Sequence, residues 1–232
     1  MLDRTIYPNL QLVQSTMTNR KIKVVPAILT DNPSTLRKMI HQAESFTTYV
    51  QIDIMDGQFV PSRSITWEHL ADLSMKLKWE AHLMVLHPEK YLSGFHQAGA
   101  RKVFFHYEAT SSPQEIIAQA RDLGLGVGLA INPETTVSTI LPLVDEVDSI
   151  LLMTVNPGFY GSKFIPEVMD EVAELRDARP RIEIGVDGGV RESNITQIAR
   201  AGVGVIYVGS AIFLQPQPGE SYRCLLALAQ ES

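Results

Sequence analysis

Two aspartates and one histidine stand in or directly after short apolar runs of this sequence, where ionisable side chains are unusual. Asp53 and His82 lie within two such runs, and Asp187 directly follows a third. A buried carboxylate is costly unless it is paired, hydrogen-bonded or bound to a metal. The two carboxylates and the imidazole form a mixed oxygen and nitrogen donor set that suits Zn²⁺, Mn²⁺, Fe²⁺ or Co²⁺. The alternative is structural, because an Asp before Gly often forms a turn and a single His is often a satisfied core residue.

Two glycine-containing turns give a second, independent signal. Gly188-Gly189 follows one apolar run and Gly209-Ser210 follows the next. Glycine permits close backbone approach, and turns at such positions in barrels commonly hold a phosphate through backbone N–H groups and a helix N-terminus. Loops after strands are glycine-rich in any case, but two such turns in neighbouring terminal units favour a phosphate site. A phosphorylated small molecule is the ligand that this pattern indicates.

These candidate residues belong to a repeating pattern of short β-branched runs and longer segments with helical spacing. Most of the runs are apolar on both faces, as a parallel sheet covered by helices requires. The predicted strands are Lys23–Leu29, Tyr49–Ile54, Glu80–Val85, Lys102–His106, Gly126–Ile131, Ser149–Thr154, Arg181–Val186 and Val205–Val208. The predicted helices include Ser34–Ser45, Pro88–Ala98, Pro113–Leu123, Ile165–Arg176 and Glu192–Ala201.

An uninterrupted alternation of strands and helices forms either an open doubly wound sheet or a closed (βα)₈ barrel. Eight units within about 210 residues favour the barrel, and the dinucleotide fingerprint of the open sheet is missing after the first strand. We therefore predict an α/β protein with one TIM barrel over residues 22–232 and an N-terminal extension over residues 1–21. The active site of such a barrel lies at the carboxyl ends of the strands, where the candidate residues stand.

Helix ends support these boundaries. Asn32 and Ser112 each precede a proline, so we expect their side chains to cap the helices that begin there. Gly99 and Gly202 follow predicted helices, where a left-handed C-terminal cap favours glycine.

Composition excludes several classes of protein. The chain of 232 residues carries 20 Lys and Arg against 26 Asp and Glu, a formal net charge of −6 at pH 7. This balance argues against nucleic acid or an anionic membrane as the main partner. The only cysteine, Cys224, cannot form an internal disulfide, and no stretch reaches the ~18 apolar residues of a membrane helix. The first twenty residues are unlike a secretory signal, so we expect a cytoplasmic protein.

Seven motifs occur in order between residues 22 and 230. They are PAIL (26–29), IDIMDGQFVPS (52–62), AHLMVLHPEKY (81–91), VGLAINPETT (127–136), LLMTVNPGF (151–159), IGVDGGV (184–190) and VGSAIF (208–213). Together they resemble the ribulose-phosphate 3-epimerase family, the pentose- and hexulose-phosphate 3-epimerases. The related decarboxylase group does not fit, because its Asp-x-Lys-x-x-Asp motif needs a lysine where Met55 stands.

The resemblance implies interconversion of ribulose 5-phosphate and xylulose 5-phosphate, a step of the pentose phosphate pathway. A proton leaves carbon 3, beside the ketone, and another returns from the opposite face. Asp53 and Asp187 match the family's two acid/base carboxylates, one starting ionised and the other protonated. Gln51, Asp53, His82 and Asp187 match the family's metal ligands, and a divalent metal there stabilises the enediolate.

The resemblance also assigns substrate contacts. Three methionines match family residues that pack polarizable sulfur against the intermediate, whereas without the resemblance plain apolar packing would be the favoured interpretation. The predicted substrate-binding residues are Met55, Met84, Met153, Gly158, Gly161, Gly188, Gly189, Gly209 and Ser210. We expect a small phosphorylated ketose as substrate, no nucleic acid or membrane partner, and leave open a homo-oligomer.

Three positions depart from the family pattern. Gln51 stands where the family has a histidine, which predicts weaker zinc binding, since an amide oxygen is a harder and weaker donor than imidazole. Ala27 replaces a serine whose hydrogen bond to substrate would contribute about 1 kcal/mol. Tyr160 replaces a glycine of a substrate-covering loop. His106, on the fourth strand, and Asn132, after the fifth, are candidates for the pocket, but we favour a structural role for each.

These departures keep two alternatives open. The substrate is then another ketose phosphate, such as a hexulose 6-phosphate, or the barrel binds phosphate and has lost catalysis. Only the last alternative predicts that the carbon 3 proton does not exchange with solvent.

Overall fold

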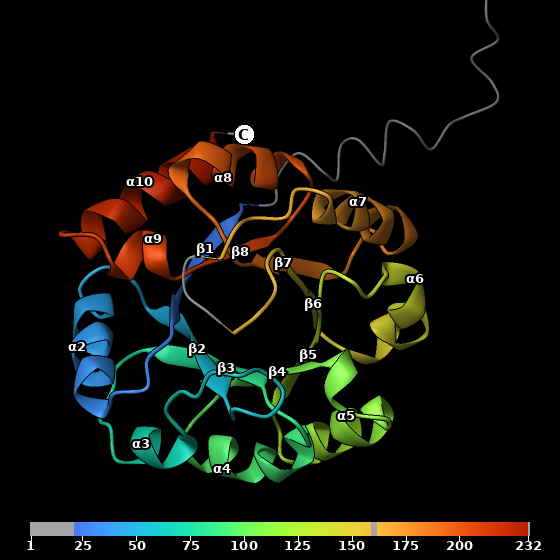
Figure 1. The fold of residues 1–232 in the computed structure, drawn as a ribbon, viewed down its shortest axis with the longest axis horizontal. Coiled ribbons are helices and arrows are strands. Elements are labelled where there is room, and N and C mark those ends of the chain that lie inside the picture. Colours follow the sequence, from blue (N-terminus) through green and yellow to red (C-terminus); the bar gives the residue numbers. More distant parts are fainter. Residues whose placement is uncertain (1–20, 159–161, 232) are drawn as a thin grey trace, which may run out of the picture.

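Eight parallel strands form a closed barrel in the computed structural model, which describes residues 21–158 and 162–231. Figure 1 looks along the barrel, with the strands around its centre and the helices outside them. The strands are β1 (Lys23–Ile28), β2 (Tyr49–Met55), β3 (Lys78–Met84), β4 (Lys102–His106), β5 (Gly126–Ile131), β6 (Ser149–Met153), β7 (Glu183–Asp187) and β8 (Val205–Val208). The predicted strands are confirmed, with ends that differ by two residues at most.

The strands follow one another in chain order around the barrel. The last strand returns to the first, and β8 pairs with β1 in parallel from Lys23–Val205 to Pro26–Val208. This pairing confirms the closed barrel and excludes the open doubly wound sheet. The predicted N-terminal extension lies outside the described residues, apart from Lys21, and its boundary stays a prediction.

Helices and short 3₁₀ turns connect the strands. The helices are α2 (Pro33–Ala43), α3 (Trp67–Ala71), α4 (Leu92–Gln97), α5 (Pro113–Asp122), α6 (Val137–Ile140), α7 (Val168–Ala178), α8 (Glu192–Arg200), α9 (Ser210–Phe213) and α10 (Pro218–Gln230). The 3₁₀ turns are η1 (Pro88–Lys90), η2 (Tyr107–Ala109) and η3 (Leu141–Glu146). None of the described helices is both long enough and apolar enough to cross a bilayer.

The single predicted helix Pro88–Ala98 is wrong in one respect, because the structure divides it into η1 and α4. Tyr91 ends the first turn by donating its N–H to the Pro88 carbonyl, in a tighter i+3 pattern than an α-helix uses. His87, just before the turn, adopts the left-handed conformation with φ +58°.

Three of the four predicted caps are confirmed. The Asn32 side chain accepts hydrogen bonds from two backbone N–H groups at the start of α2, at 2.9 and 3.0 Å. Gly99 and Gly202 have φ values of +95° and +98°, the left-handed conformation expected after a helix. The Ser112 cap is wrong, because its side chain makes no capping hydrogen bond and only its backbone carbonyl accepts from the first turn of α5.

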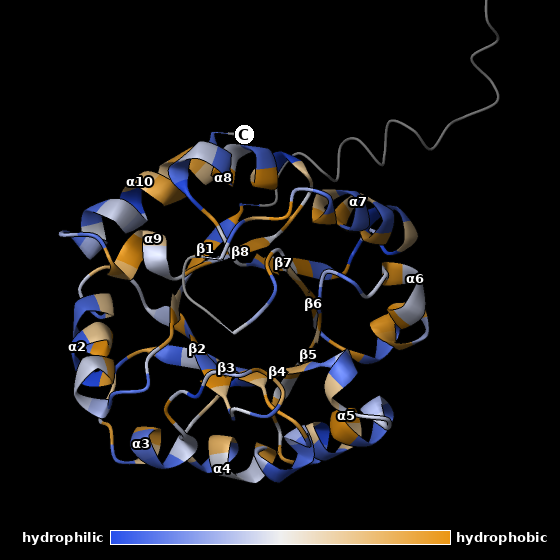
Figure 2. Cartoon of the chain, viewed as in Figure 1, coloured by the Kyte–Doolittle hydropathy of each residue, from blue (hydrophilic) through white to orange (hydrophobic). Residues whose placement is uncertain are grey.

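Apolar residues fill two separate layers of the barrel. The larger layer lies between the strands and the helices, which carry polar residues as well (Figure 2). The smaller layer fills the barrel interior and includes Val25, Phe104, Leu151 and Tyr207. Gly128 on β5 leaves space for Phe104, since a Cβ atom there would stand 2.2 Å from the Phe104 ring. This packed interior leaves the carboxyl ends of the strands as the place for a site.

Charged residues gather at the opposite end of the barrel, where the strands begin. Lys102 Nζ lies 3.7 Å from carboxylate oxygens of both Glu80 and Glu183, and Lys23 Nζ lies 2.9 Å from Glu183. The Tyr49 hydroxyl donates to Glu80 at 2.8 Å. We refer to these five residues as the basal cluster.

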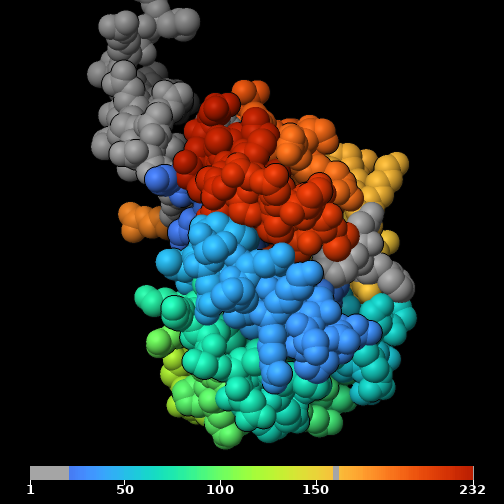
Figure 3. Space-filling model, turned by 90° about the vertical axis from the view of Figure 1, so that its left-hand side faces the viewer, coloured from blue at the N-terminus to red at the C-terminus, as the bar shows by residue number. Residues whose placement is uncertain are grey.

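Helix α10 closes the seam between the first and last units. It packs against α8, α9, β1 and α2, and Figure 3 shows it in red directly beside the blue first unit. The Gln230 amide donates to the Ile22 carbonyl at 3.3 Å. The described ends of the chain thus meet on one side of the barrel.

Candidate active site

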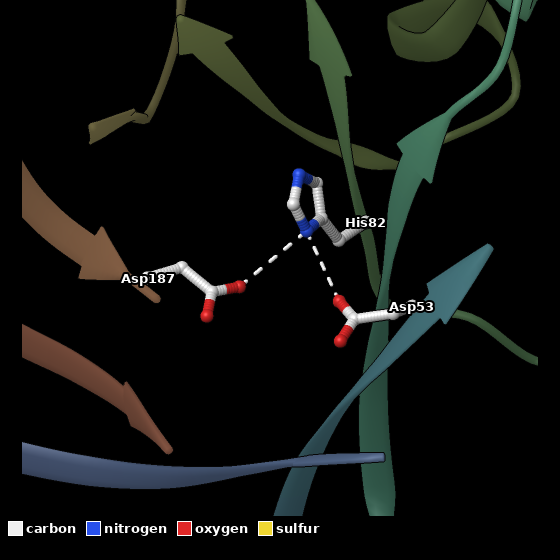
Figure 4. A group of neighbouring side chains, drawn as sticks. All are labelled: Asp53, His82 and Asp187. Carbon is white, nitrogen blue, oxygen red and sulfur yellow. Dashed lines mark hydrogen bonds and ion pairs between the residues drawn. The ribbon is translucent and has the colours of Figure 1, made fainter. Parts of the chain in front are cut away.

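The carboxyl ends of β2, β3 and β7 bring the three predicted ionisable residues together. Asp53 pairs in register with His82 across β2 and β3. His82 Nδ1 lies 3.0 Å from Asp53 Oδ1 and 3.5 Å from Asp187 Oδ2, as Figure 4 shows. The ligand atoms of the three side chains all lie within 4.8 Å of one another, and all three residues are buried. The predicted convergence of Asp53, His82 and Asp187 is confirmed.

Hydroxyl side chains fix the two strand ends that carry the aspartates. Ser64 Oγ donates to the Asp53 carbonyl at 2.9 Å and accepts from the Met55 N–H at 2.9 Å, which holds the end of β2. Thr154 Oγ1 contacts the carbonyls of Asp187 and Gly188, at 3.0 and 2.6 Å. The backbone positions of both carboxylates are therefore constrained by neighbouring loops.

Burial and mutual charge shift the protonation of this cluster. Burial opposes the charge on His82, but hydrogen bonds and attraction from Asp187 and Asp53 outweigh it and raise the pKa of His82 to about 9. Burial also raises the pKa of Asp53 to about 6, with the charge of Asp187 adding to the effect and the hydrogen bond to His82 opposing it. The cluster therefore holds protons near neutral pH that a bound cation would displace.

The three donors fit a divalent metal. Two carboxylate oxygens and one imidazole nitrogen match the three protein ligands of a catalytic metal site, which leaves a further position for substrate or water. The donors are buried and closely spaced, and their negative charge suits a cation. Asp53, His82 and Asp187 can thus hold a metal ion.

Gln51 lies directly beneath the two aspartates and is fully buried. Its Nε2 donates to Asp187 at 2.7 Å and to Asp53 at 3.1 Å. Its Oε1 is buried without a hydrogen-bond partner among the described residues. A half turn about the last side-chain torsion would exchange the two atoms and aim Oε1 at the carboxylates, an arrangement that only a cation between them would favour. The ligand role of Gln51 stays a prediction.

One cavity above the cluster contains the predicted substrate residues that the structure describes. They are Met55, Met84, Met153, Gly158, Gly188, Gly189, Gly209 and Ser210, together with Asp53 and Asp187. Gly161 and Tyr160 lie outside the described residues. Ala27 lines the cavity too, so this departure from the family pattern faces the site.

Gly188 and Gly189 cannot be replaced easily. Their φ values are +115° and +62°, in the region that favours glycine. A Cβ atom on Gly188 would stand 2.4 Å from Val155, and one on Gly189 would stand 2.8 Å from the backbone of Phe164. The double glycine is therefore required by the turn itself, and the same turn exposes backbone to the cavity.

Sequence reasoning missed several apolar residues of the cavity wall. Leu29, Val155, Val190 and Tyr207 line it. Tyr207 stands on β8 opposite Asp187 in the register. Tyr207 shares the interior face of β8 with Val205, two residues earlier, and this period of two was the available signal.

His106 contacts the cluster through His82. Its Nε2 is 3.0 Å from His82 Nε2, and it is fully buried. Burial lowers the pKa of His106 to about 4, which keeps the ring neutral. Asn132 does not reach the cavity, and its backbone N–H donates to Glu108 at 2.8 Å.

Comparison with known proteins identifies relatives along nearly the whole barrel. The model of the Ribulose-phosphate 3 epimerase family matches residues 23–213. Ribulose-phosphate 3-epimerase of Schizosaccharomyces pombe is 36% identical over 206 residues, covering 85% of this chain and 90% of that protein. The Synechocystis protein of the same name is 37% identical over 215 residues, covering 88% and 92%. The cytoplasmic isoform of Oryza sativa is 39% identical over 183 residues, covering 76% and 80%.

Solved structures share the barrel at lower identity. 3-Hexulose-6-phosphate synthase from Salmonella typhimurium superposes with a TM-score of 0.71 at 17% identity, covering 90% of this chain and 99% of that one. KGPDC from Streptococcus mutans gives a TM-score of 0.72 at 11% identity, covering 90% and 98%. At these identities the likeness shows the fold alone.

Proposed function

Because the chain belongs to the ribulose-phosphate 3-epimerase family, we propose that it inverts carbon 3 of D-ribulose 5-phosphate to give D-xylulose 5-phosphate. The observation that carries the proposal is the placement of Asp53 and Asp187. They reach one cavity from β2 and β7, with His82 between them. Two carboxylates that approach a substrate from different strands suit a reaction that removes a proton from one face and returns one to the other.

The two aspartates exchange roles with the direction of the reaction. One carboxylate removes the carbon 3 proton beside the ketone, and the protonated partner delivers a proton to the opposite face of the flat enediolate. The two residues therefore start each turnover in different protonation states. Ser64 and Thr154 support this task by holding the strand ends from which the carboxylates project.

Asp53, His82 and Asp187 are the proposed ligands of a divalent metal, with Gln51 as a fourth ligand after rotation of its amide. Zinc, manganese, iron and cobalt all suit this donor set. When bound, such an ion supplies positive charge that stabilises the oxygens of the enediolate. The amide oxygen of Gln51 is a weaker zinc donor than imidazole, so we expect reduced zinc affinity.

The remaining cavity residues bind and orient the ketose phosphate. We assign the phosphate to the backbone at Gly188, Gly189, Gly209 and Ser210, since these residues line the cavity at the ends of β7 and β8. We assign Met55, Met84 and Met153, with Gly158, to the carbon chain, where polarizable sulfur packs against the flat intermediate. Gly161 belongs to the same proposed set.

The setting of the reaction is also proposed. A cytoplasmic location is supported by the name of one relative, a cytoplasmic isoform, and the proposed substrate is a small phosphorylated sugar. We propose no nucleic acid partner, and a homo-oligomer is a matter for measurement. The barrel over residues 22–232 is the proposed catalytic domain, and residues 1–21 are the proposed N-terminal extension.

NMR of the purified protein with ribulose 5-phosphate, hexulose 6-phosphate and unphosphorylated ribulose tests the proposal, together with metal analysis. We expect xylulose 5-phosphate from the first compound and little turnover of the third. Faster turnover of the hexulose phosphate would reassign the substrate. No epimerisation of any compound by the metal-loaded protein would leave only a phosphate-binding barrel.

A further inference from the structure

His106 is a buried histidine directly behind the histidine that faces the proposed metal. Its Nε2 lies 3.0 Å from Nε2 of His82, and the two rings are tilted by only 22° with centroids 5.1 Å apart. Phe59 also packs against His106, with its ring centroid 4.8 Å from that of the imidazole. His106 does not line the substrate cavity, and the proposed reaction assigns it no role.

The contact between the two rings fixes which nitrogen of each imidazole carries a proton. Two ring nitrogens at hydrogen-bond distance share one proton. His82 Nδ1 faces Asp53 and Asp187, so a metal among these groups takes the Nδ1 lone pair and the proton of His82 stands on Nε2. His106 must then accept through Nε2, and its own proton must stand on Nδ1.

Glu108 stands where that proton points. Its Oε2 lies 3.4 Å from His106 Nδ1, within ion-pair distance, and Nδ1 makes no hydrogen bond to the described residues. Its Oε1 accepts from the Asn132 backbone N–H at 2.8 Å and from the Thr135 hydroxyl. These two donors hold the carboxylate in an orientation that leaves Oε2 beside His106 Nδ1. A carboxylate only accepts, which matches the proton order that the metal imposes.

We propose that His106 and Glu108 are positioning residues that fix the tautomer and the ring orientation of His82 for metal binding. The proposal rests on the metal site of the proposed function. Metal-binding histidines commonly donate their second N–H to a carboxylate, and this chain extends that arrangement by one imidazole. Glu108 lines a separate cavity with Glu134, Thr135 and Thr136, so the carboxylate end of the series lies outside the substrate cavity.

Glu108→Gln tests the order of protons. Its carbonyl oxygen can keep the contacts with Asn132 and Thr135, which turns the amide N–H groups toward His106 and opposes the His106 Nδ1 proton. We expect zinc affinity, measured by chelator competition, to fall 10- to 100-fold. The matched control is Glu134→Gln, which removes a carboxylate from the same cavity without contacting either histidine. We expect the control to change zinc affinity by no more than about twofold.

Substitution of His106 separates proton order from packing. His106→Gln keeps one donor and one acceptor in line, so zinc affinity should stay near the wild-type value. His106→Phe keeps a ring and loses both nitrogens, so zinc affinity should fall 10- to 100-fold. Histidine ¹⁵N NMR of the zinc-loaded wild type should show His82 protonated on Nε2 and His106 on Nδ1.

Unchanged zinc affinity in Glu108→Gln would overturn the proposal, as would the opposite tautomers in the wild type. Equal loss in His106→Gln and His106→Phe would overturn it too, because packing alone would then explain the effect. A wild type that binds zinc with these tautomers and catalyses no epimerisation would contradict the proposed function and leave this proposal standing.

Discussion

The barrel has a charged cluster at each end, and the two clusters balance their charge differently. In the basal cluster, Glu80 and Glu183 meet the ammonium groups of Lys102 and Lys23. In the active-site cluster, which comprises Asp53, Asp187, His82 and Gln51, the described partners of the two aspartates are His82 and the neutral amide of Gln51. Within residues 21–158 and 162–231, no lysine or arginine forms an ion pair with either aspartate.

This difference shows how one fold separates stability from chemistry. A buried carboxylate with an ammonium partner is neutralised permanently, and loss of the partner is costly. Two carboxylates that share one imidazole are not fully neutralised, so they can still bind a metal ion or take up a proton. The carboxyl ends of the strands thus carry the reactive cluster, and the amino ends carry the compensated one.

The largest effect is expected when either aspartate is neutralised. Asp53→Asn and Asp187→Asn each remove one of two acid/base groups that cannot replace one another across the plane of the intermediate. Epimerisation should fall at least 10²- to 10⁴-fold, measured as xylulose 5-phosphate formation. Near wild-type turnover in either variant would show that the active-site cluster does not use two bases.

Lys102→Met removes a buried ammonium group from the basal cluster. Its ammonium is mostly buried, with 13% of the side chain exposed, and its loss leaves the buried Glu80 carboxylate with neutral tyrosine hydroxyls, from Tyr49 and Tyr207, and no nearby ammonium among the described residues. We expect the free energy of unfolding in urea to fall by about 3 kcal/mol. The kcat/KM of the folded protein should stay within about twofold of wild type. A large loss of activity without loss of stability would contradict the division of roles.

Gln51→His adds an imidazole to the active-site cluster. If position 51 faces the cation, a second nitrogen donor should raise zinc affinity about tenfold or more, because imidazole suits zinc better than an amide oxygen. Calorimetric zinc titration of both proteins measures the change. Equal affinities would mean that Gln51 serves only as a hydrogen-bond donor to Asp53 and Asp187.

Lys23→Met should have the smallest effect. Its side chain is 64% exposed, and solvent screens its ion pair with Glu183. We expect the free energy of unfolding to change by less than about 1 kcal/mol, measured in urea beside Lys102→Met. Equal losses in the two lysine variants would show that burial does not distinguish the ion pairs of the basal cluster.

The sequence predicts the barrel and its reactive residues because both depend on short-range periodicity. Strands apolar on both faces mark the parallel sheet, and alternation along β2 and β3 places Asp53 and His82 together. The link from His82 through His106 to Glu108 depends on contacts between neighbouring strands and the loop after them. The spacing along the chain gives no direct sign of it.

The basal cluster was missed for a related reason. Lys102 stands at the start of its predicted strand, where a polar residue is ordinary, and nothing local shows that it will turn inward to Glu80. The predicted side-chain cap at Ser112 is wrong because α5 begins with Pro113 and uses only the Ser112 backbone carbonyl as an acceptor for its first turn. Long-range contacts therefore decide the features that pattern and propensity leave open.

Deuterium exchange at carbon 3 tests the two-base use of the active-site cluster most directly. Ribulose 5-phosphate and xylulose 5-phosphate would each be incubated in D₂O with wild type, Asp53→Asn and Asp187→Asn, and followed by NMR. We predict exchange of both epimers by wild type, and exchange of only one epimer, a different one for each variant, without interconversion. Exchange of the same epimer by both variants, or of neither epimer by the metal-loaded wild type, would contradict the account.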